Sequence, residues 1–288
     1  LRTGVISKLP SHDMGSFMKG KIRSYGVSDD FFMYDDSPSA RVGIYYYENG
    51  AYPRKPKVIY DRANSSFYSL KIDEIPEKAY TASRCFHTSG ITLALSPKVR
   101  ETAIEMIKRF KAAGTLVSFD VNFRGNLWTG EEAKECIEQI LPYVDIFFCS
   151  EDTARLTFKK TGTAREMMKS FTEEYPISIV ASTQRIVHSP KSHTFGSIIY
   201  DARKDIYYEE EPYRDIDVVD RIGSGDAYIS GALYGLLTSD FEKAVRYGNA
   251  TSAVKNTIPG DLPSSDLEEI ETIIKAHNQT GFQSEMAR

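Results

Sequence analysis

The central part of the chain alternates strand-like and helix-like segments, and this alternation constrains the fold more than any other feature of the sequence. The segments are, in chain order, a strand at residues 84–88, a helix opened by Ser96 and Pro97 and closed by Gly114, a strand at 115–119, a helix near 130–140 and a strand at 144–149. The first of these helices carries Val99, Ala103 and Phe110 on one face, the spacing of a surface that packs against a sheet. Such alternation predicts an α/β fold with a mostly parallel sheet.

The other segments are shorter or less regular. Strands are expected at residues 1–7, 41–47, 57–62, 177–182, 196–200 and 206–210. Helices are expected at residues 13–25 and 227–237, and two more after the capping boxes Ser239 to Glu242 and Ser265 to Glu268. A loop is expected at Gln184 to Phe195. The second and third of these strands are rich in tyrosine and are joined by a polar turn without an intervening helix. We expect them to form a small sheet at residues 37–66, set apart from a core of residues 1–36 and 67–288.

Composition and charge exclude several classes of function. The chain has 288 residues, of which 41% are hydrophobic, so we expect a soluble globular protein with a sizeable core. Its formal net charge of −4 offers no basic field for a nucleic acid. No apolar run approaches the length of a membrane span, so we expect a cytoplasmic protein without a membrane partner. The chain opens on Leu1, inside a strand-like segment, so we also expect further residues upstream.

The stretch from Asp220 to Tyr228 places two glycines and a carboxylate at the mouth of an apolar helix. A turn built on Gly223 and Gly225 aims main-chain N–H groups at one point, where the helix dipole also favours negative charge, so a phosphate is the natural occupant. Asp226 would weaken simple phosphate binding, but it suits a base that takes the proton from an attacking hydroxyl. We therefore predict phosphoryl transfer at this turn. The plainer alternative is a glycine turn with a helix-capping aspartate.

Two other phosphate-binding motifs do not fit the sequence. A dinucleotide-binding fingerprint needs a third glycine at the position of Tyr228. The segment from Gly15 to Lys21 nearly matches a Walker A loop, but Ile22 occupies the position of the magnesium-binding serine or threonine. We expect this segment to be part of an ordinary amphipathic helix.

The glycine turn resembles the signature of the PfkB, or ribokinase-like, family of carbohydrate kinases. The resemblance is carried by Asp220, Gly223, Gly225, Asp226 and Ala227, with a departure at Arg221. It implies a three-layer α/β sandwich with a mostly parallel central sheet, and it makes the small sheet at residues 37–66 a lid over the substrate. By the same resemblance Asp226 is the catalytic base. The anion hole consists of the N–H groups of Gly223, Ser224 and Gly225.

Further segments resemble one branch of that family, the 2-keto-3-deoxygluconate kinases. They are His87 to Pro97, Asp120 to Trp128, Asn256 to Asp261 and the tail Gly281 to Arg288. A sugar acid carries a carboxylate, and arginine binds carboxylates through paired hydrogen bonds. The resemblance implies a substrate site made of Tyr45, Tyr60, Arg62, Arg124, Asp226 and Asp261. As alternatives, Arg124 could pair with Asp120, and the two tyrosines could simply pack in their sheet.

The nucleotide side of the resemblance is less complete. It implies that ATP contacts Asn122, Arg124, Thr183, Gly223, Gly225 and Asn249. Mg²⁺ would accompany the ATP, and a monovalent cation is a further candidate cofactor. The family's magnesium-associated N-x-x-E motif is replaced by Ser150-Glu151-Asp152-Thr153, so Glu151 is a candidate metal contributor only through a water molecule. The resemblance also implies a homo-oligomer joined through the lid.

The predicted reaction is transfer of the γ-phosphoryl group of ATP to the 6-hydroxyl of 2-keto-3-deoxygluconate. Two alternatives stay open. One is a kinase for another substrate, such as fructose or 2-keto-3-deoxygalactonate. The other is a catalytically silent sugar-phosphate sensor, which would have no need of a base at Asp226.

Overall fold

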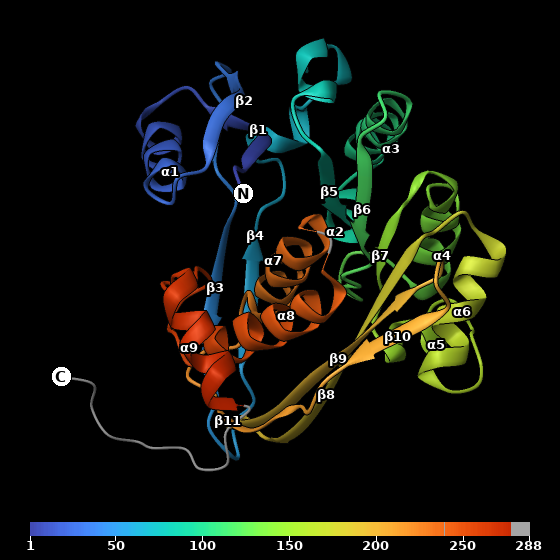
Figure 1. Ribbon diagram of the computed structural model, residues 1–288. Helices are drawn as coiled ribbons and strands as arrows, with labels where there is room; N and C mark the ends of the chain where they lie inside the picture. Colours follow the sequence, from blue (N-terminus) through green and yellow to red (C-terminus); the bar gives the residue numbers. More distant parts are fainter. Residues whose placement is uncertain (239, 278–288) are drawn as a thin grey trace. The chain divides into compact units, whose positions relative to one another are not determined.

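The computed structural model describes residues 1–238 and 240–277 (Figure 1). The described residues form two compact units: the first comprises Leu1–Glu48 and Val58–Ile179, and the second comprises Asn49–Lys57 and the described residues from Val180 onward. Within the described ranges, no helix combines the length and the apolar character that a bilayer crossing requires.

Three parallel strands form the centre of the first unit and confirm the predicted alternation. They are β5 (Cys85–Ser89), β6 (Leu116–Asp120) and β7 (Ile146–Phe148). β6 pairs in parallel with both neighbours, and the register sets Asp120 opposite Ser89 on one side and opposite Phe148 on the other. The three strands therefore end level with one another. The residues that follow them share one edge of the sheet, which is where open α/β sheets place their ligands.

The helix between β5 and β6 shows why local sequence signals predicted this region well. α3 (Pro97–Ala112) begins with a proline, and the Ser96 hydroxyl accepts a hydrogen bond from a first-turn N–H at 3.2 Å. Gly114, just beyond the end, has a φ of 81°, a conformation that glycine adopts without steric cost. On the buried face, the ring of Phe110 stacks on Phe86 of β5 with the centroids 4.0 Å apart.

The other elements of the first unit lie before and after this stretch in the chain. They are β1 (Gly4–Pro10), α1 (Asp13–Ser24), β2 (Ser28–Asp35), β3 (Ile44–Glu48), β4 (Lys57–Asp61), α2 (Gly90–Ala94), α4 (Gly130–Glu138), α5 (Glu151–Leu156), α6 (Ala164–Glu174) and 3₁₀ turns at Ser66–Ser69, Ile72–Glu74, Glu77–Thr81 and Leu141–Tyr143. β1 and β2 pair in parallel, whereas β3 and β4 form a separate two-stranded sheet. The two tyrosine-rich strands therefore pair with each other, as predicted. β2 was not predicted, because its aspartates interrupt any regular alternation of polar and apolar residues.

The strands of the second unit are arranged around β9. They are β8 (Ile179–Ser189), β9 (Ser192–Asp201), β10 (Ile206–Glu209) and β11 (Tyr213–Asp217). β9 lies beside β8 and pairs antiparallel with β10 and β11. The predicted loop from Gln184 to Phe195 is therefore wrong, since both of its arms belong to the β8–β9 hairpin, where His188 and Thr194 are hydrogen-bonded at 2.9 Å. The β8 arm is mostly exposed, and its polar residues are interrupted by Ile186 and Val187 side by side, so it shows no alternation of polar and apolar residues that would identify a strand.

Three helices complete the described part of the second unit. They are α7 (Ser224–Leu237), α8 (Phe241–Asn256) and α9 (Leu267–His277) (Figure 1). α7 and α8 approach each other closely, because a Cβ added to Gly235 of α7 would lie only 2.2 Å from the nitrogen of Ala244 in α8. α8 and α9 pack through a small apolar cluster that includes Val254 and Ile270.

The starts of α8 and α9 correct the predicted capping boxes. The caps are Asp240 and Asp266, whose carboxylates accept hydrogen bonds from the N–H three residues later at 2.8 and 2.9 Å. Ser265 therefore precedes the cap of α9, while Ser239 and the tail Gly281 to Arg288 lie outside the described residues. At both helices a serine is followed directly by an aspartate, which is an equally good cap, so the sequence pattern alone does not choose between them.

Candidate active site

The predicted site residues are divided between the two units. The first unit holds Tyr45, Tyr60, Arg62, Asn122, Arg124 and Glu151, and the second holds Thr183, Gly223, Ser224, Gly225, Asp226, Asn249 and Asp261. The glycine turn is the most defined feature among them. Gly223 is the N-cap of α7, with a φ of 79° and no side-chain cap, so the first-turn N–H groups of this helix have no intrahelical acceptor. Such a helix end attracts anions.

Only glycine fits at position 223. A Cβ there would lie 2.5 Å from the main-chain oxygen of Asp261, far inside van der Waals contact, and its φ is in the left-handed region. This close approach places Asp261 beside the turn, although it lies 38 positions after Gly223 in the sequence. The predicted substrate site needs Asp261 and the turn to lie close together. Asp226 is the third residue of α7 and is exposed to solvent. Its carboxylate can therefore meet a ligand at the same helix end.

The turn is held from behind by Asp220, a role that the sequence analysis did not assign. This aspartate is buried, and its two carboxylate oxygens accept hydrogen bonds from the N–H groups of Ile222 at 2.9 Å and Gly260 at 3.0 Å. The main-chain N–H of Asp220 also donates to the oxygen of Asn256 at 3.1 Å. One carboxylate thus joins the turn to the segment that carries Asp261. Hydrogen bonds to a carboxylate are stronger than those between neutral groups, so this link stabilises the shape of the turn.

Asn249 and Thr183, predicted to contact the nucleotide, lie in regular elements. Thr183 lies within β8, and Asn249 is a fully buried residue of α8. The Asn249 amide oxygen accepts a hydrogen bond from Ser197 at 2.7 Å, and its nitrogen donates to Glu210 at 3.2 Å. Burial raises the pKa of Glu210, and the hydrogen bond from Asn249 opposes that rise. Sequence reasoning missed both partners, because they are separated from Asn249 by 52 and 39 positions.

In the first unit, Asn122 and Arg124 follow the end of β6. Asn122 has a φ of 38°, and its N–H donates to a carboxylate oxygen of Asp120 at 3.1 Å, which turns the chain sharply at the sheet edge. Arg124 is exposed, and its guanidinium donates to the main-chain oxygen of Phe123 at 3.1 Å. Both polar side chains therefore lie at the edge where β5, β6 and β7 end.

The three predicted lid residues come together on the small sheet. The rings of Tyr45 and Tyr60 have centroids 6.3 Å apart, and the guanidinium carbon of Arg62 lies 4.3 Å from the centre of the Tyr60 ring. The Nη2 atom of Arg62 is buried and has no hydrogen-bond acceptor among residues 1–238 and 240–277. The neighbouring carboxylate of Asp61 is already paired with Arg41 at 2.7 Å, and this pairing lowers the pKa of Asp61. The guanidinium of Arg62 therefore stacks on the ring of Tyr60, and its Nη2 donor has no acceptor in the described part of the chain.

Glu151 lies in the first turn of α5, and its carboxylate is paired with Arg155 at 2.9 Å. The described part of the chain contains no group of three histidine, cysteine, aspartate or glutamate side chains arranged to hold a metal ion.

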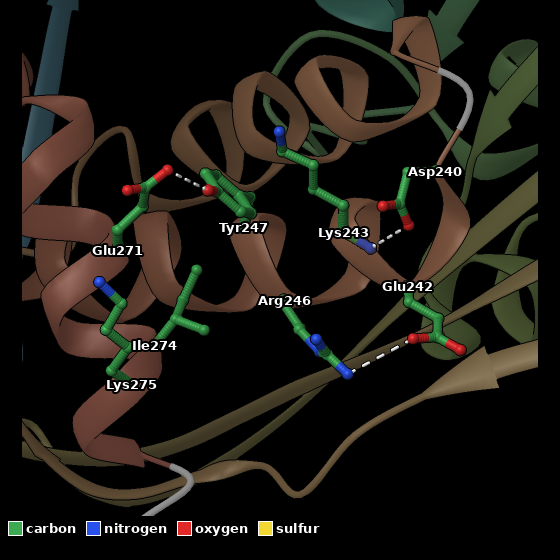
Figure 2. A pocket seen from close by; sticks show the side chains of 8 residues that line it. All are labelled: Asp240, Glu242, Lys243, Arg246, Tyr247, Glu271, Ile274 and Lys275. Atoms are coloured by element: carbon green, nitrogen blue, oxygen red, sulfur yellow. Dashed lines mark hydrogen bonds and ion pairs between the residues drawn. The ribbon is translucent and has the colours of Figure 1, made fainter.

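A surface cavity of about 320 Å³ lies at α8 and α9, as Figure 2 shows. It is lined by Asp240, Glu242, Lys243, Arg246, Tyr247, Glu271, Ile274 and Lys275. The acidic and basic side chains balance, and several are paired: Tyr247 donates to Glu271 at 2.7 Å, and Arg246 contacts Glu242 at 3.4 Å. Burial and the contact with Glu271 raise the pKa of Tyr247 to about 12. None of the predicted site residues lines this cavity, so it is separate from the glycine turn.

An α/β chain with an anion-attracting helix end and an exposed carboxylate in its first turn has the features of a phosphate-handling enzyme. Residues 1–267 match the family described as pfkB family carbohydrate kinase, so the chain belongs to this family and is a carbohydrate kinase. The family resemblance and the ribokinase-like α/β fold inferred from the sequence are therefore confirmed.

Individual relatives support the same assignment. The chain is 33% identical over 271 residues to a 2-dehydro-3-deoxygalactonokinase of Haloferax volcanii, covering 94% of this chain and 81% of that protein. The crystal structure of 2-dehydro-3-deoxygluconokinase from Thermotoga maritima matches with a TM-score of 0.89 and 30% identity, covering 96% of this chain and 84% of that one. An Escherichia coli structure called ribokinase II, in complex with ATP and Mg²⁺, shares the fold with a TM-score of 0.78 and 23% identity, covering 96% and 83%.

Proposed function

We propose that this kinase transfers the γ-phosphoryl group of ATP to the 6-hydroxyl of 2-keto-3-deoxygluconate. Two relatives of about one-third identity are named for sugar acids of this type, one a galactonate and one a gluconate derivative. The observation that carries the proposal for this chain is Arg62, whose guanidinium is stacked on Tyr60 and keeps a buried Nη2 donor. A carboxylate is the ligand group that best satisfies such a donor.

The substrate contacts proposed in the first unit are Tyr45, Tyr60, Arg62 and Arg124. Residues 37–66 are proposed to act as the lid, so that the small sheet supplies the first three of these residues. A buried guanidinium nitrogen without an acceptor costs free energy, which a bound carboxylate would recover. A neutral sugar such as fructose has no group of equal strength for this position. The arrangement therefore favours an acid over a neutral sugar.

The chemistry is assigned to the start of α7. Asp226 would accept the proton of the attacking hydroxyl while that oxygen bonds to the γ-phosphorus and the bond from phosphorus to the β-phosphate oxygen breaks. The N–H groups of Gly223, Ser224 and Gly225 would bind the transferred oxygens, and Asp261 would bind substrate hydroxyls. Asn122, Arg124, Thr183 and Asn249 are proposed on the nucleotide side.

ATP and Mg²⁺ are the proposed cofactors. The glycine-capped end of α7 suits a phosphate because it combines N–H groups that have no acceptor within the helix with the positive end of a 14-residue helix; the N–H of Ser224 now donates to the main-chain oxygen of Arg221 at 3.2 Å and would turn to the phosphate. Mg²⁺ neutralises charge on the phosphates when it is bound with the nucleotide. Glu151 is the proposed protein contributor to that ion, through a water molecule, although its carboxylate already contacts Arg155.

The first test compares sugar acids with neutral sugars in the wild type and in Arg62→Ala. We expect phosphorylation of the acid, a KM for the acid that rises about tenfold or more in the variant, and little change for a neutral sugar. Arg23→Ala is a matched control, because Arg23 is an exposed arginine of the same unit with only a 3.9 Å contact to Asp29. Equal preference for acids in the wild type and the Arg62 variant would contradict the proposed pocket.

The second test removes the proposed base. Asp226→Asn should lower kcat about a hundredfold or more, the usual scale of general-base help, while ATP still binds. Nucleotide binding measured by calorimetry separates the two effects. Turnover close to that of the wild type would show that Asp226 is not the base.

Two alternatives remain within reach of the same assays. The Haloferax volcanii relative favours 2-keto-3-deoxygalactonate as a second candidate substrate, since it is 33% identical to this chain. Parallel kcat/KM values for the two epimeric acids decide between them. A sugar-phosphate sensor would bind such ligands without any turnover, and the carboxylate at position 226 argues against it.

We also propose that the protein is a homo-oligomer joined through the lid. The small sheet exposes apolar side chains of Ile44, Tyr46 and Ile59, which are 40%, 59% and 53% exposed. Covering such side chains is favourable by about 25 cal/mol per Å² of buried apolar area. Light scattering after size exclusion should therefore give more than one chain per particle, and Tyr46→Lys should shift the mass toward the monomer. A monomeric wild type would refute this arrangement.

A further inference from the structure

Lys255 is a completely buried lysine in the last turn of α8, with 0% of its surface exposed. Its ammonium group donates to the main-chain oxygen of Ile258 at 3.1 Å and to that of Asp220 at 3.3 Å. Burial lowers the pKa of Lys255, and the negative charges of Asp220 and Asp261 oppose this change. Charged lysines are rarely buried without a specific role, because the loss of hydration is costly.

The position of this ammonium group points to its role. Its two acceptors belong to two different segments, one leading into the glycine turn and one leading to Asp261. The Lys255 Cε atom lies 3.6 Å from the point that a Cβ on Gly223 would occupy. The positive charge thus lies directly behind the N-cap of α7. It holds together the two segments that shape the end of this helix, alongside the carboxylate of Asp220.

We propose that Lys255 is a positioning residue whose ammonium acts as a built-in monovalent cation for the anion-binding turn, so that this kinase needs no dissolved potassium, sodium or ammonium ion. The assignment rests on the proposed function of the turn. A single positive charge in contact with two main-chain carbonyl oxygens is what a bound potassium ion would supply at the same place. A covalently attached ammonium supplies it without the loss of translational freedom that binding a free ion entails.

The charge has two effects on the turn. It donates hydrogen bonds to the main-chain oxygens of Asp220 and Ile258, which fixes the main chain on either side of Gly223. It also adds positive potential in the low-dielectric interior behind the first turn of α7, where phosphoryl oxygens are proposed to bind. Loss of the charge should therefore affect turnover more strongly than binding of the sugar.

The first experiment measures kcat and KM of the wild type in chloride salts of potassium, sodium, ammonium and tetramethylammonium at equal ionic strength. The proposal expects the same kcat in all four, within about twofold, because Lys255 already supplies the positive charge. Tetramethylammonium is the reference cation, since it is too large for a lysine-sized site. The assay uses whichever carbohydrate the wild type phosphorylates. Activation by potassium or ammonium over tetramethylammonium would overturn the proposal.

The second experiment uses Lys255→Met, which keeps an unbranched side chain, one heavy atom shorter, but removes its charge. We expect kcat to fall about a hundredfold, with a smaller change in KM, and ammonium or potassium to restore part of it, at least about tenfold. Lys275→Met is the matched control, because Lys275 is an exposed lysine of α9, and it should show neither loss nor restoration. An unchanged kcat, or a loss in a folded variant that no small cation restores, would overturn the proposal.

A third measurement needs no substrate and so distinguishes failure of this inference from failure of the proposed function. The Tm of Lys255→Met should be higher in ammonium chloride than in tetramethylammonium chloride, because a cation that binds the folded state stabilises it. The Tm of the wild type should be the same in both salts, because Lys255 already fills the site. Equal Tm values for the variant in the two salts would count against a cation site. A wild type that phosphorylates no sugar acid would refute only the proposed substrate.

Discussion

The close approach of α7 to α8 allows a direct test of how the glycine turn is positioned. A Cβ on Gly235 would lie 2.2 Å from the nitrogen of Ala244 and 2.3 Å from its Cα. Ordinary van der Waals contact begins near 3.4 Å, so α7 must move away from α8 by about 1.2 Å in Gly235→Ala. The obstacle is main chain, which cannot rotate out of the way as a side chain can. The turn that begins α7 must move with the helix.

The magnitude follows from two opposing terms. Alanine in place of glycine favours the helix by about 1 kcal/mol, whereas forcing two packed helices apart costs roughly 2–4 kcal/mol. The net loss is about 1–3 kcal/mol, which for a unit of this size lowers Tm by several degrees, at about 2–4 °C per kcal/mol. A displacement of about 1 Å at reacting groups can cost as much as a hundredfold in rate. We therefore expect turnover to fall more than stability alone explains.

Differential scanning calorimetry and steady-state kinetics check both expectations. Gly20→Ala is the matched control, because Gly20 lies within α1 and a Cβ there would meet no atom within 4 Å. It should raise stability by about 0.5–1 kcal/mol and leave kcat unchanged. If Gly235→Ala melts at or above the wild-type temperature, the two helices are not packed as described, and the reasoning fails.

Three further predictions concern other parts of the molecule. Gly223→Ala should abolish most turnover and destabilise the chain by at least about 1–2 kcal/mol, because alanine disfavours this φ and its Cβ would clash with Asp261. A fully active variant would contradict the assignment of the turn as the phosphate site. Burial raises the pKa of Glu210, so the carboxyl group binds its proton more tightly in the folded chain than in the unfolded chain. The free energy of unfolding should therefore fall as the pH rises from the ordinary carboxyl range through the raised pKa. Melting curves of Glu210→Gln should lack this fall, and an unaltered slope would refute the cause. Asp145→Ala should lower the free energy of unfolding by about 2–3 kcal/mol, because this buried carboxylate contacts the ammonium of Lys111 at 2.6 Å and accepts from the N–H of Val117 at 2.9 Å. An unchanged midpoint of urea unfolding would show that these contacts contribute nothing to stability.

Elements that depend on local signals could be predicted from the sequence, whereas elements that depend on pairing with distant segments could not. α3 was predicted from Ser96 to Gly114 because a cap, a proline and a left-handed glycine are all local requirements. β2 was missed, because it depends on parallel pairing with β1 rather than on its own pattern. The arms of the β8–β9 hairpin were taken for a loop for the same reason. Pairing between strands is a property of the whole unit, and exposed polar strands carry little trace of it.

The candidate site divides in the same way. The glycine turn, Asp226 at the third position of α7 and the family to which the chain belongs could all be inferred from nine consecutive residues together with a few separate motifs. The sequence placed Arg62 and Tyr60 in one predicted strand, but it did not show that the guanidinium stacks on the ring. That the Nη2 atom of Arg62 is buried without an acceptor could not be predicted from the sequence. The partners of Asn249 and the role of Asp220 appeared only when distant segments were placed side by side.

The amino-acid sequence by itself therefore determined the class of fold, the helix that begins after Gly223 and the kind of ligand that such a helix end attracts. Those features depend on main-chain dihedral angles and hydrogen bonds within a few residues. Only the tertiary structure decided what lies behind the turn, namely the carboxylate of Asp220 and the buried ammonium of Lys255, 35 positions away. A lysine in a helix is usually a solvated surface residue, and only the folded chain buries Lys255 beside two carbonyl oxygens.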